Sequence, residues 1–223
     1  MLPIVWNWKI SINTTFMTRQ QNLMFMRFAM LLAIIGCSVP LQAQSWEFAK
    51  EKEGIRIYTM KVKDKPLKAY KGIAEINAPA EKVFALIENV NNTDWWDKSL
   101  SQIKVLGYEK NRFARYHLIF DMPWPVSDRE LFVDAEVTID TVTGTRKITA
   151  MPLRVDTPSS KDMIRISEYR QTWTVKPVSS NLTQVTLEGY VNPGGSLPAW
   201  IINMFIVDAP MNSIGEVKKR TTR

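Results

Sequence analysis

The chain has 223 residues and a net charge of +7, a mild basic excess that is not gathered into the dense patch which nucleic-acid binding requires. It contains a single histidine, His117, and a single cysteine, Cys37. A histidine-rich metal site and a disulfide framework are therefore excluded, and a Ser-His-Asp triad could be built only at His117, which no nucleophile-elbow sequence accompanies. We expect no cofactor, no metal and no nucleic-acid partner.

The first 43 residues are predicted to be an N-terminal extension, covering 1–25, followed by a signal peptide that is cleaved after Ala43. They carry three basic residues and no acidic one. Their apolar run at 28–35 is shorter than the roughly 20 residues that span a bilayer. The sequence "IIGC", which ends at Cys37, also resembles the lipobox of bacterial lipoproteins. We therefore expect an exported protein, periplasmic or secreted, with lipoprotein processing at Cys37 as the alternative.

Residues 45–223 contain no internal repeat, low-complexity tract or linker, which predicts one domain of about 179 residues. Its first ten residues are expected to form a short helix that begins at the N-cap Ser45 and ends at Gly54. Two strands with period-two alternation are predicted to follow at 55–62 and 67–76.

A helix is predicted over 77–90, where Val83, Leu86 and Ile87 recur at three- and four-residue spacing. The sequence "NNTDWW" follows it, and its Asn and Asp residues favour a turn. Trp95 and Trp96 are therefore expected on a loop or a short helical turn.

Six further strands are predicted with no helix between them, so that neighbouring strands should pair antiparallel and the sheet has to curl or close. In the second of these strands Tyr116 and Leu118 share the inward face, and His117 points the other way. The six strands are predicted at 99–108, 111–120, 130–140, 145–151, 163–176 and 182–191.

On the strand at 163–176, Tyr169, Gln171 and Trp173 share one face. These side chains could contact the polar end of a ligand in an apolar pocket. The alternative is that they stabilise the sheet through cross-strand pairs.

A long helix is predicted at the C-terminus, after Gly194 and Gly195 and with Ser196 as its N-cap. Its apolar residues spread well beyond a normal amphipathic face, and Pro210 should kink or loosen it. The main apolar stripe consists of Trp200, Met204, Val207, Met211 and Ile214.

This order of elements predicts an α+β protein in which one strongly curved antiparallel sheet wraps around the long C-terminal helix. A sheet that grips a single helix often encloses an internal hydrophobic cavity, and concave apolar sites of this kind bind ligands.

Three segments of the chain, in the expected order, resemble the START (StAR-related lipid transfer) family of the helix-grip superfamily. "PAEKVFALIENVNNTDWWDKSL" is similar to the family's helix and Trp-Asp pair, here Trp96 and Asp97. "MPWPVSDRELFV" is similar to its Pro-aromatic-Pro and Arg-acid element, with Arg129 and with Glu130 in place of the usual Asp. "NPGGSLPAWIINMFIVDAPMNSIGEVKK" is similar to its Gly-rich turn and last helix. The resemblance covers roughly residues 50–222.

The resemblance implies that the protein is a monomer and not an enzyme. It implies binding of one hydrophobic ligand, such as a sterol or phospholipid, in a tunnel under the C-terminal helix, with transfer through transient contact with a membrane surface. For each candidate tunnel residue, packing in the core is the alternative. For Arg129 the alternative is a buried guanidinium that holds a corner of the sheet by pairing with Asp128, Glu130 or Asp97. The candidates are Trp96, Tyr116, Leu118, Arg129, Tyr169, Trp173, Trp200, Met204, Val207 and Met211.

Two other functions remain open on the sequence. A helix-grip enzyme of the polyketide cyclase or aromatase type would need paired acid and base groups inside the cavity, for which Tyr116, Glu168 and Tyr169 could be recruited. A module that binds only a protein partner would need a filled core without a cavity.

Overall fold

The computed structural model describes residues 45–96, 99–159, 162–198, 201–202 and 204–222. The compact unit that contains them spans Gln44–Arg223. The predicted extension and signal peptide at 1–43, including Cys37, lie outside the described residues. Within the described ranges, no helix is long and apolar enough to cross a bilayer.

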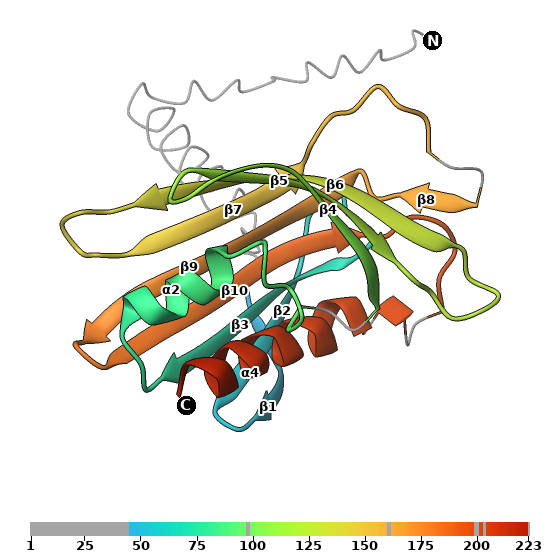
Figure 1. Ribbon diagram of the computed structural model, residues 1–223. Helices are drawn as coiled ribbons and strands as arrows, with labels where there is room; N and C mark the ends of the chain where they lie inside the picture. The colour runs from blue at the N-terminus through green and yellow to red at the C-terminus, as the bar shows by residue number, and fades with distance from the viewer. Residues whose placement is uncertain (1–44, 97–98, 160–161, 199–200, 203, 223) are drawn as a thin grey trace, which may run out of the picture. The chain divides into compact units, whose positions relative to one another are not determined.

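Ten strands of the described chain form one curved sheet (Figure 1). The path through the sheet runs β1-β2-β3-β10-β9-β7-β6-β5-β4, with each pair antiparallel, and β8 pairs with β6 in parallel. This confirms the predicted α+β fold with a strongly curved antiparallel sheet. The strands are β1 (Glu47–Lys52), β2 (Ile55–Lys61), β3 (Lys68–Ile76), β4 (Leu100–Glu109), β5 (Phe113–Phe120), β6 (Asp128–Ile139), β7 (Arg146–Pro152), β8 (Met163–Arg165), β9 (Glu168–Ser179) and β10 (Leu182–Asn192).

The helix predicted for the first ten residues of this unit is wrong, because they form the edge strand β1 and turn into β2. Glu53 and Gly54 have φ angles of 53° and 75° and connect the paired residues Lys52 and Ile55. Positive φ at both central residues is the geometry of a two-residue hairpin turn of type I′. Gly54, which is predicted to end a helix, is therefore half of a hairpin turn.

The strand predicted at 163–176 is in fact two strands, β8 and β9, interrupted at Ile166 and Ser167. β8 pairs in parallel with the first residues of β6, whereas β9 pairs antiparallel with β10 and β7. The Ile166 N–H donates to the carbonyl oxygen of Glu130 at 2.9 Å, and after this bond the chain that follows β8 separates from β6. The inward apolar positions change from even numbers (Ile166) to odd numbers (Trp173, Val175) across the break, and the prediction of a single strand overlooked this change of phase.

Two helical segments lie on the same face of the curved sheet (Figure 1). The predicted helix at 77–90 is confirmed as α2 (Ala80–Glu88), and it buries Val83, Phe84 and Ile87. At the C-terminus, a π-helical turn, η1 (Met204–Asp208), leads into α4 (Ala209–Thr221). The interruption predicted at Pro210 takes the form of a widened helical turn that ends two residues before it. Pro210 itself has no N–H to donate to the preceding turn.

The apolar stripe of α4 packs against β2 and β3. The side chain of Ile214 is fully buried beside Ile57, and it crosses β3 at Gly72. A Cβ atom on Gly72 would lie 2.5 Å from Cδ1 of Ile214, so a larger residue at this position would force the side chain of Ile214 to move. Met211 and Val217 are buried on the same side of the helix.

Candidate ligand-binding cavity

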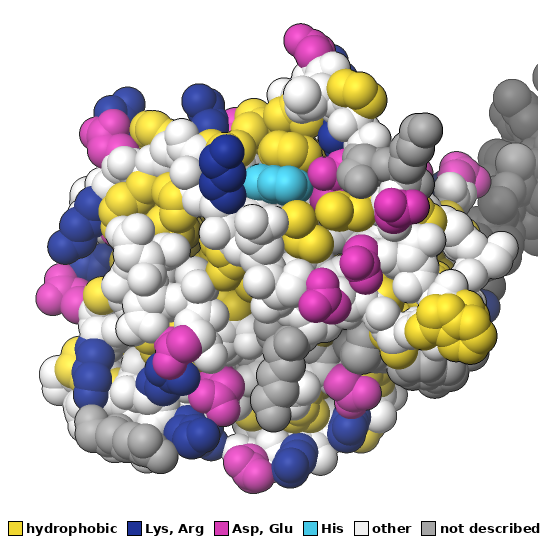
Figure 2. All heavy atoms as spheres, turned by 45° about the vertical axis from the view of Figure 1, so that its right-hand side comes forward, with side chains coloured by type: hydrophobic (Ala, Val, Ile, Leu, Met, Phe, Trp, Pro, Cys, Tyr) yellow, Lys and Arg dark blue, Asp and Glu magenta, His cyan; other side chains and the backbone are white. Residues whose placement is uncertain are grey.

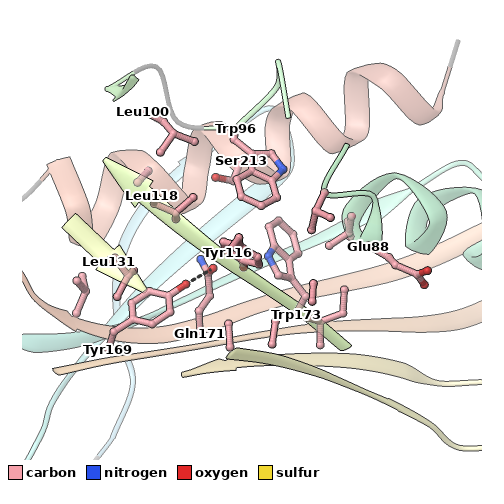
Figure 3. Close-up of a pocket in the computed structure, with 18 of the residues that line it drawn as sticks. Glu88, Trp96, Leu100, Tyr116, Leu118, Leu131, Tyr169, Gln171, Trp173 and Ser213 are labelled. Atoms are coloured by element: carbon pink, nitrogen blue, oxygen red, sulfur yellow. Dashed lines mark hydrogen bonds between the residues drawn. The ribbon is translucent and has the colours of Figure 1, made fainter. Parts of the chain in front are cut away.

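An internal cavity of about 170 Å³ lies between the concave face of the sheet, the end of α2 and the helix α4 (Figure 3). Its wall is formed mainly by apolar and aromatic side chains from β3 to β7, β9 and β10. The two residues of α4 that reach it, Ala209 and Ser213, are small. The cavity is therefore a predominantly apolar chamber inside the fold.

Part of the cavity wall is a row of small residues in register across the sheet. Ala114 on β5 pairs with Ala135 on β6, which pairs with Ala150 on β7. The same register pairs Ala150 with Gln171 on β9, and Gln171 with Gly189 on β10. Directly paired residues point to the same face of a sheet, and all three alanines line the cavity. We call Ala114, Ala135 and Ala150 the small-residue row, and their short side chains leave space that the cavity occupies.

A cluster of aromatic rings lines the middle of the cavity. The ring centroids of Trp95 and Trp96 are 6.2 Å apart, those of Trp95 and Trp173 are 6.4 Å apart, and those of Trp96 and Tyr116 are 5.4 Å apart. All three contacts are edge-to-face, the arrangement that aromatic pairs prefer. The cluster is therefore a packed wall rather than a set of separate side chains.

A hydrogen-bonded chain of neutral groups crosses the wall between β9 and β3. The Tyr169 hydroxyl donates to Oε1 of Gln171 at 2.8 Å, and Nε2 of Gln171 donates to the Tyr70 hydroxyl at 3.2 Å. Gln171 and Tyr70 can meet because Gly189, which pairs with both of them, has no side chain between them. Burial raises the pKa of Tyr70, Tyr116 and Tyr169, so these hydroxyl groups are uncharged at neutral pH.

Glu88, a residue with a carboxyl group, lies at the end of the cavity wall opposite Tyr169 (Figure 3). Glu88 is only 6% exposed, and its Oε1 accepts hydrogen bonds from the Tyr108 hydroxyl at 3.0 Å and from the Asn111 N–H at 3.1 Å. Burial raises the pKa of Tyr108, and the hydrogen bond to Glu88 raises it further.

Half of the ten predicted tunnel residues line the cavity: Trp96, Tyr116, Leu118, Tyr169 and Trp173. Trp200 lies outside the described residues, and so does the side chain of Met204. The remaining three candidates, Arg129, Val207 and Met211, do not line the cavity.

Val207 and Met211 lie away from the cavity because the apolar stripe of the C-terminal helix packs in the core. Met211 is buried, and Val207 packs against the same cluster of core residues. The neighbouring face of the helix, with Ala209 and Ser213, borders the cavity instead. Large side chains fill the space beside them, so a helix leaves room for a cavity where its residues are small.

Arg129 is 1% exposed, and its guanidinium group donates to backbone carbonyl groups. Its Nε donates to the oxygen of Pro193 at 3.1 Å, its Nη2 to the oxygen of Gly194 at 2.9 Å, and its Nη1 to the oxygen of Ser127. Burial lowers the pKa of Arg129, and the charge of Asp128 opposes that shift. The guanidinium therefore joins the start of β6 to the turn before the C-terminal helix. Among the described residues, which exclude Asp97, Arg129 forms no ion pair with the carboxylates expected as its partners, Asp128 and Glu130.

The acidic neighbour of Arg129 belongs to the opposite face of the sheet. Oε1 of Glu130 accepts from Nε of Arg165 at 2.9 Å, and its Oε2 lies 3.2 Å from Nε2 of His117. Although burial acts to raise it, hydrogen bonds from Ser159, Arg165 and His117 hold the pKa of Glu130 below its usual value. Figure 2 shows His117, the only histidine of the chain, at the molecular surface, so it points away from the cavity as predicted.

The sequence did not reveal Tyr70, Glu88 or the small-residue row as parts of the cavity wall. Glu88 follows the buried Ile87 at the end of α2, and a charged residue at the end of a helix is expected to be exposed to solvent. Each alanine of the row is a single small residue in a different strand, and only the pairing register brings them together. Tyr70 could have been predicted to line the cavity, because the alternation of β3 places its side chain on the inward face of the sheet.

A curved antiparallel sheet that holds a C-terminal helix over an internal cavity defines a helix-grip protein. A family model described as polyketide cyclase/dehydrase and lipid transport matches residues 71–209. The chain therefore belongs to the family of polyketide cyclase/dehydrase and lipid transport proteins, which confirms the superfamily that its motifs resemble.

Individual relatives agree with this placement. The chain is 33% identical over 184 residues to an uncharacterized protein of Pseudomonas aeruginosa, covering 82% of this chain and 89% of the relative. It is 25% identical over 177 residues to the phosphatidylcholine transfer protein of Homo sapiens, covering 73% of this chain and 77% of that protein. The crystal structure of a STAR-related lipid transfer protein from Xanthomonas axonopodis matches with a TM-score of 0.70 and 24% identity, covering 80% of this chain and 99% of that one. The START-type fold is thereby confirmed.

Proposed function

We propose that the protein binds one hydrophobic ligand, a sterol, phospholipid or related lipid, in its internal cavity and passes it between membranes. The observation that carries this proposal is the apolar cavity under α4, bounded by the small-residue row. The similarity to proteins named for lipid transfer supports the same class of ligand.

The driving force for uptake is the removal of hydrocarbon from water, which stabilises the bound state by about 0.8 kcal/mol per buried methylene group. The cavity of about 170 Å³ is smaller than the pockets of about 300–1,000 Å³ that hold drug-sized ligands. Uptake of a long-chain lipid therefore requires the walls to move apart, and binding and release are coupled to an opening motion.

The direct test is to purify the protein from its own host and to measure bound lipid by native mass spectrometry after gentle desolvation. We expect one hydrophobic ligand per chain, identified by extraction. Transfer is then measured with labelled lipid in donor and acceptor vesicles. The carrier proposal fails if no stoichiometric hydrophobic ligand is recovered and the protein also takes up no lipid from vesicles.

A cyclase-type enzyme is the second candidate, and the buried carboxyl group of Glu88, a residue at one end of the cavity wall, is the observation in its favour. The groups expected to work as its acid and base do not assemble well. Burial raises the pKa of Tyr116 and Tyr169, which keeps both hydroxyl groups protonated and makes them poor proton donors, and the half-buried Glu168 pairs with Lys65 at 3.0 Å. We therefore propose a carrier without catalytic activity.

The proposal includes export, a monomeric state and transient contact with a membrane. Export rests on the signal-peptide pattern of residues 1–43. Mass measurement of the N-terminal peptide of the protein recovered from its host tests this point. A chain that begins directly after Ala43 supports cleavage by signal peptidase, and a lipidated Cys37 supports the lipoprotein alternative.

A further inference from the structure

Glu88 occupies a position that disfavours a carboxyl group for two physical reasons. It is the last residue of α2, where the helix dipole places partial negative charge, and the last turn of this helix carries no basic residue. It is also 94% buried, and burial penalises an ionised group that is not fully paired. The rest of the fold compensates these costs only in part.

The compensation is restricted to one of the two carboxyl oxygens. Oε1 accepts the two hydrogen bonds from Tyr108 and Asn111. Oε2 is buried and has no hydrogen-bond partner among the described residues. Buried polar atoms in native proteins nearly always have a partner, and an unpaired one is costly. Glu88 is one of the residues that line the cavity, and its Oε2 has no exposed surface of its own, so a free acceptor lies directly behind the wall at this end of the cavity.

The second carboxyl group in the wall differs in this respect. The side chain of Glu109 is 47% exposed and forms an ion pair with Arg112. Solvent and a cation therefore already satisfy Glu109, and it serves as a natural comparison for Glu88. The indole N–H groups of Trp95 and Trp96 are also buried without a partner among the described residues, and both residues line the same cavity.

We propose that Glu88 is a specificity-determining residue that accepts a hydrogen bond from the polar end of the ligand, which carries an ammonium or a hydroxyl group. This inference rests on the proposed function, because it needs a hydrophobic ligand in the cavity. The neighbours that cover Oε2 have to shift slightly, and the widening that admits the apolar part of the ligand provides that shift. A ligand with an anionic end is disfavoured, because its charge would meet a carboxyl group away from bulk water.

Three ligands with the same chain and different polar ends test the proposal: hexadecylamine, hexadecanol and hexadecanoic acid. Their affinities are measured at neutral pH by displacement of a fluorescent apolar probe from the whole protein. We expect the amine to bind most tightly, the alcohol next and the acid least. The Glu88→Gln variant keeps the shape and the acceptor atom of the side chain but removes its charge. We expect it to bind the amine about tenfold or more weakly, since a hydrogen bond to a charged group is worth about that much.

The control is Glu75→Gln, at an exposed carboxyl group of β3 that does not line the cavity, and we expect it to keep the wild-type order of affinities. If Glu88→Gln folds poorly, as judged by thermal unfolding, Glu88→Asp retracts the carboxyl group by one methylene and should reduce the preference for the amine. Equal binding of the amine and the acid by the wild-type protein overturns the role of Glu88 and leaves the carrier function standing. The same holds if Glu88→Gln keeps the full amine preference. Failure of all three ligands to displace the probe counts against the carrier function itself.

Discussion

Replacement of Ala135 by leucine is expected to abolish ligand uptake and to leave the fold intact. Ala135 is 2% exposed and lies in the small-residue row between Ala114 and Ala150. A leucine-to-alanine change in a protein core can open a cavity of about 150 Å³. The reverse change at Ala135 therefore fills most of the cavity of about 170 Å³. A ligand that needs this space is excluded, whereas the new side chain meets walls that are already apolar.

Two measurements check this expectation against a control at Ala74, which is equally buried but does not line the cavity. Chemical unfolding should show unchanged or higher stability for Ala135→Leu, because the added groups enter free space. The Ala74→Leu variant should lose about 1–3 kcal/mol by overpacking. Lipid uptake from vesicles should fall to background only for Ala135→Leu. Wild-type uptake by this variant, or a loss of stability equal to that of the control, would refute the reasoning.

Three further predictions concern the framework around the cavity. Arg129→Leu leaves one buried and two partly buried carbonyl groups without their donor and should lower the free energy of unfolding by about 3 kcal/mol or more. Normal stability combined with lost lipid binding would instead assign Arg129 to the ligand. Gly189→Ala places a Cβ atom 2.4 Å from the Tyr70 hydroxyl oxygen and 2.8 Å from the backbone oxygen of Arg170, and urea unfolding should show a loss of about 1–3 kcal/mol. The lowered pKa of Glu130 means that its contribution to stability is complete above its usual value of 4.5 and is lost as the pH falls through the lowered pKa. Urea unfolding between neutral and acidic pH should therefore show a weaker acid dependence for Glu130→Gln, and identical curves for variant and wild type would contradict the role of this carboxylate.

The parts of the fold that depend on local pattern could be predicted from the sequence. The spacing of Val83 and Ile87 identified α2, and the alternation of Tyr116 and Leu118 identified the inward face of β5. The hairpin at Gly54 was missed because a glycine after a short charged segment is compatible with the end of a helix and with a type I′ turn.

The cavity itself depends on information that the sequence does not display. Apolar periodicity reports that Met211 is buried, but it does not distinguish a core contact from a cavity wall. The small-residue row exists only through the register of the strands. The role of Arg129 at a corner was among the sequence-based alternatives, yet its carbonyl partners at Pro193 and Gly194 lie more than sixty residues away along the chain.

The register of the small-residue row has a consequence for how the protein can change its ligand. Backbone hydrogen bonds hold Ala114, Ala135 and Ala150 in fixed positions. The size of the side chain at each position therefore limits the depth of the cavity there. Alanine, valine and leucine at these three sites would shorten the chamber in steps of a few methyl groups without moving the sheet or the helix. The size of the ligand that this cavity accepts is thus open to adjustment by single substitutions in the small-residue row.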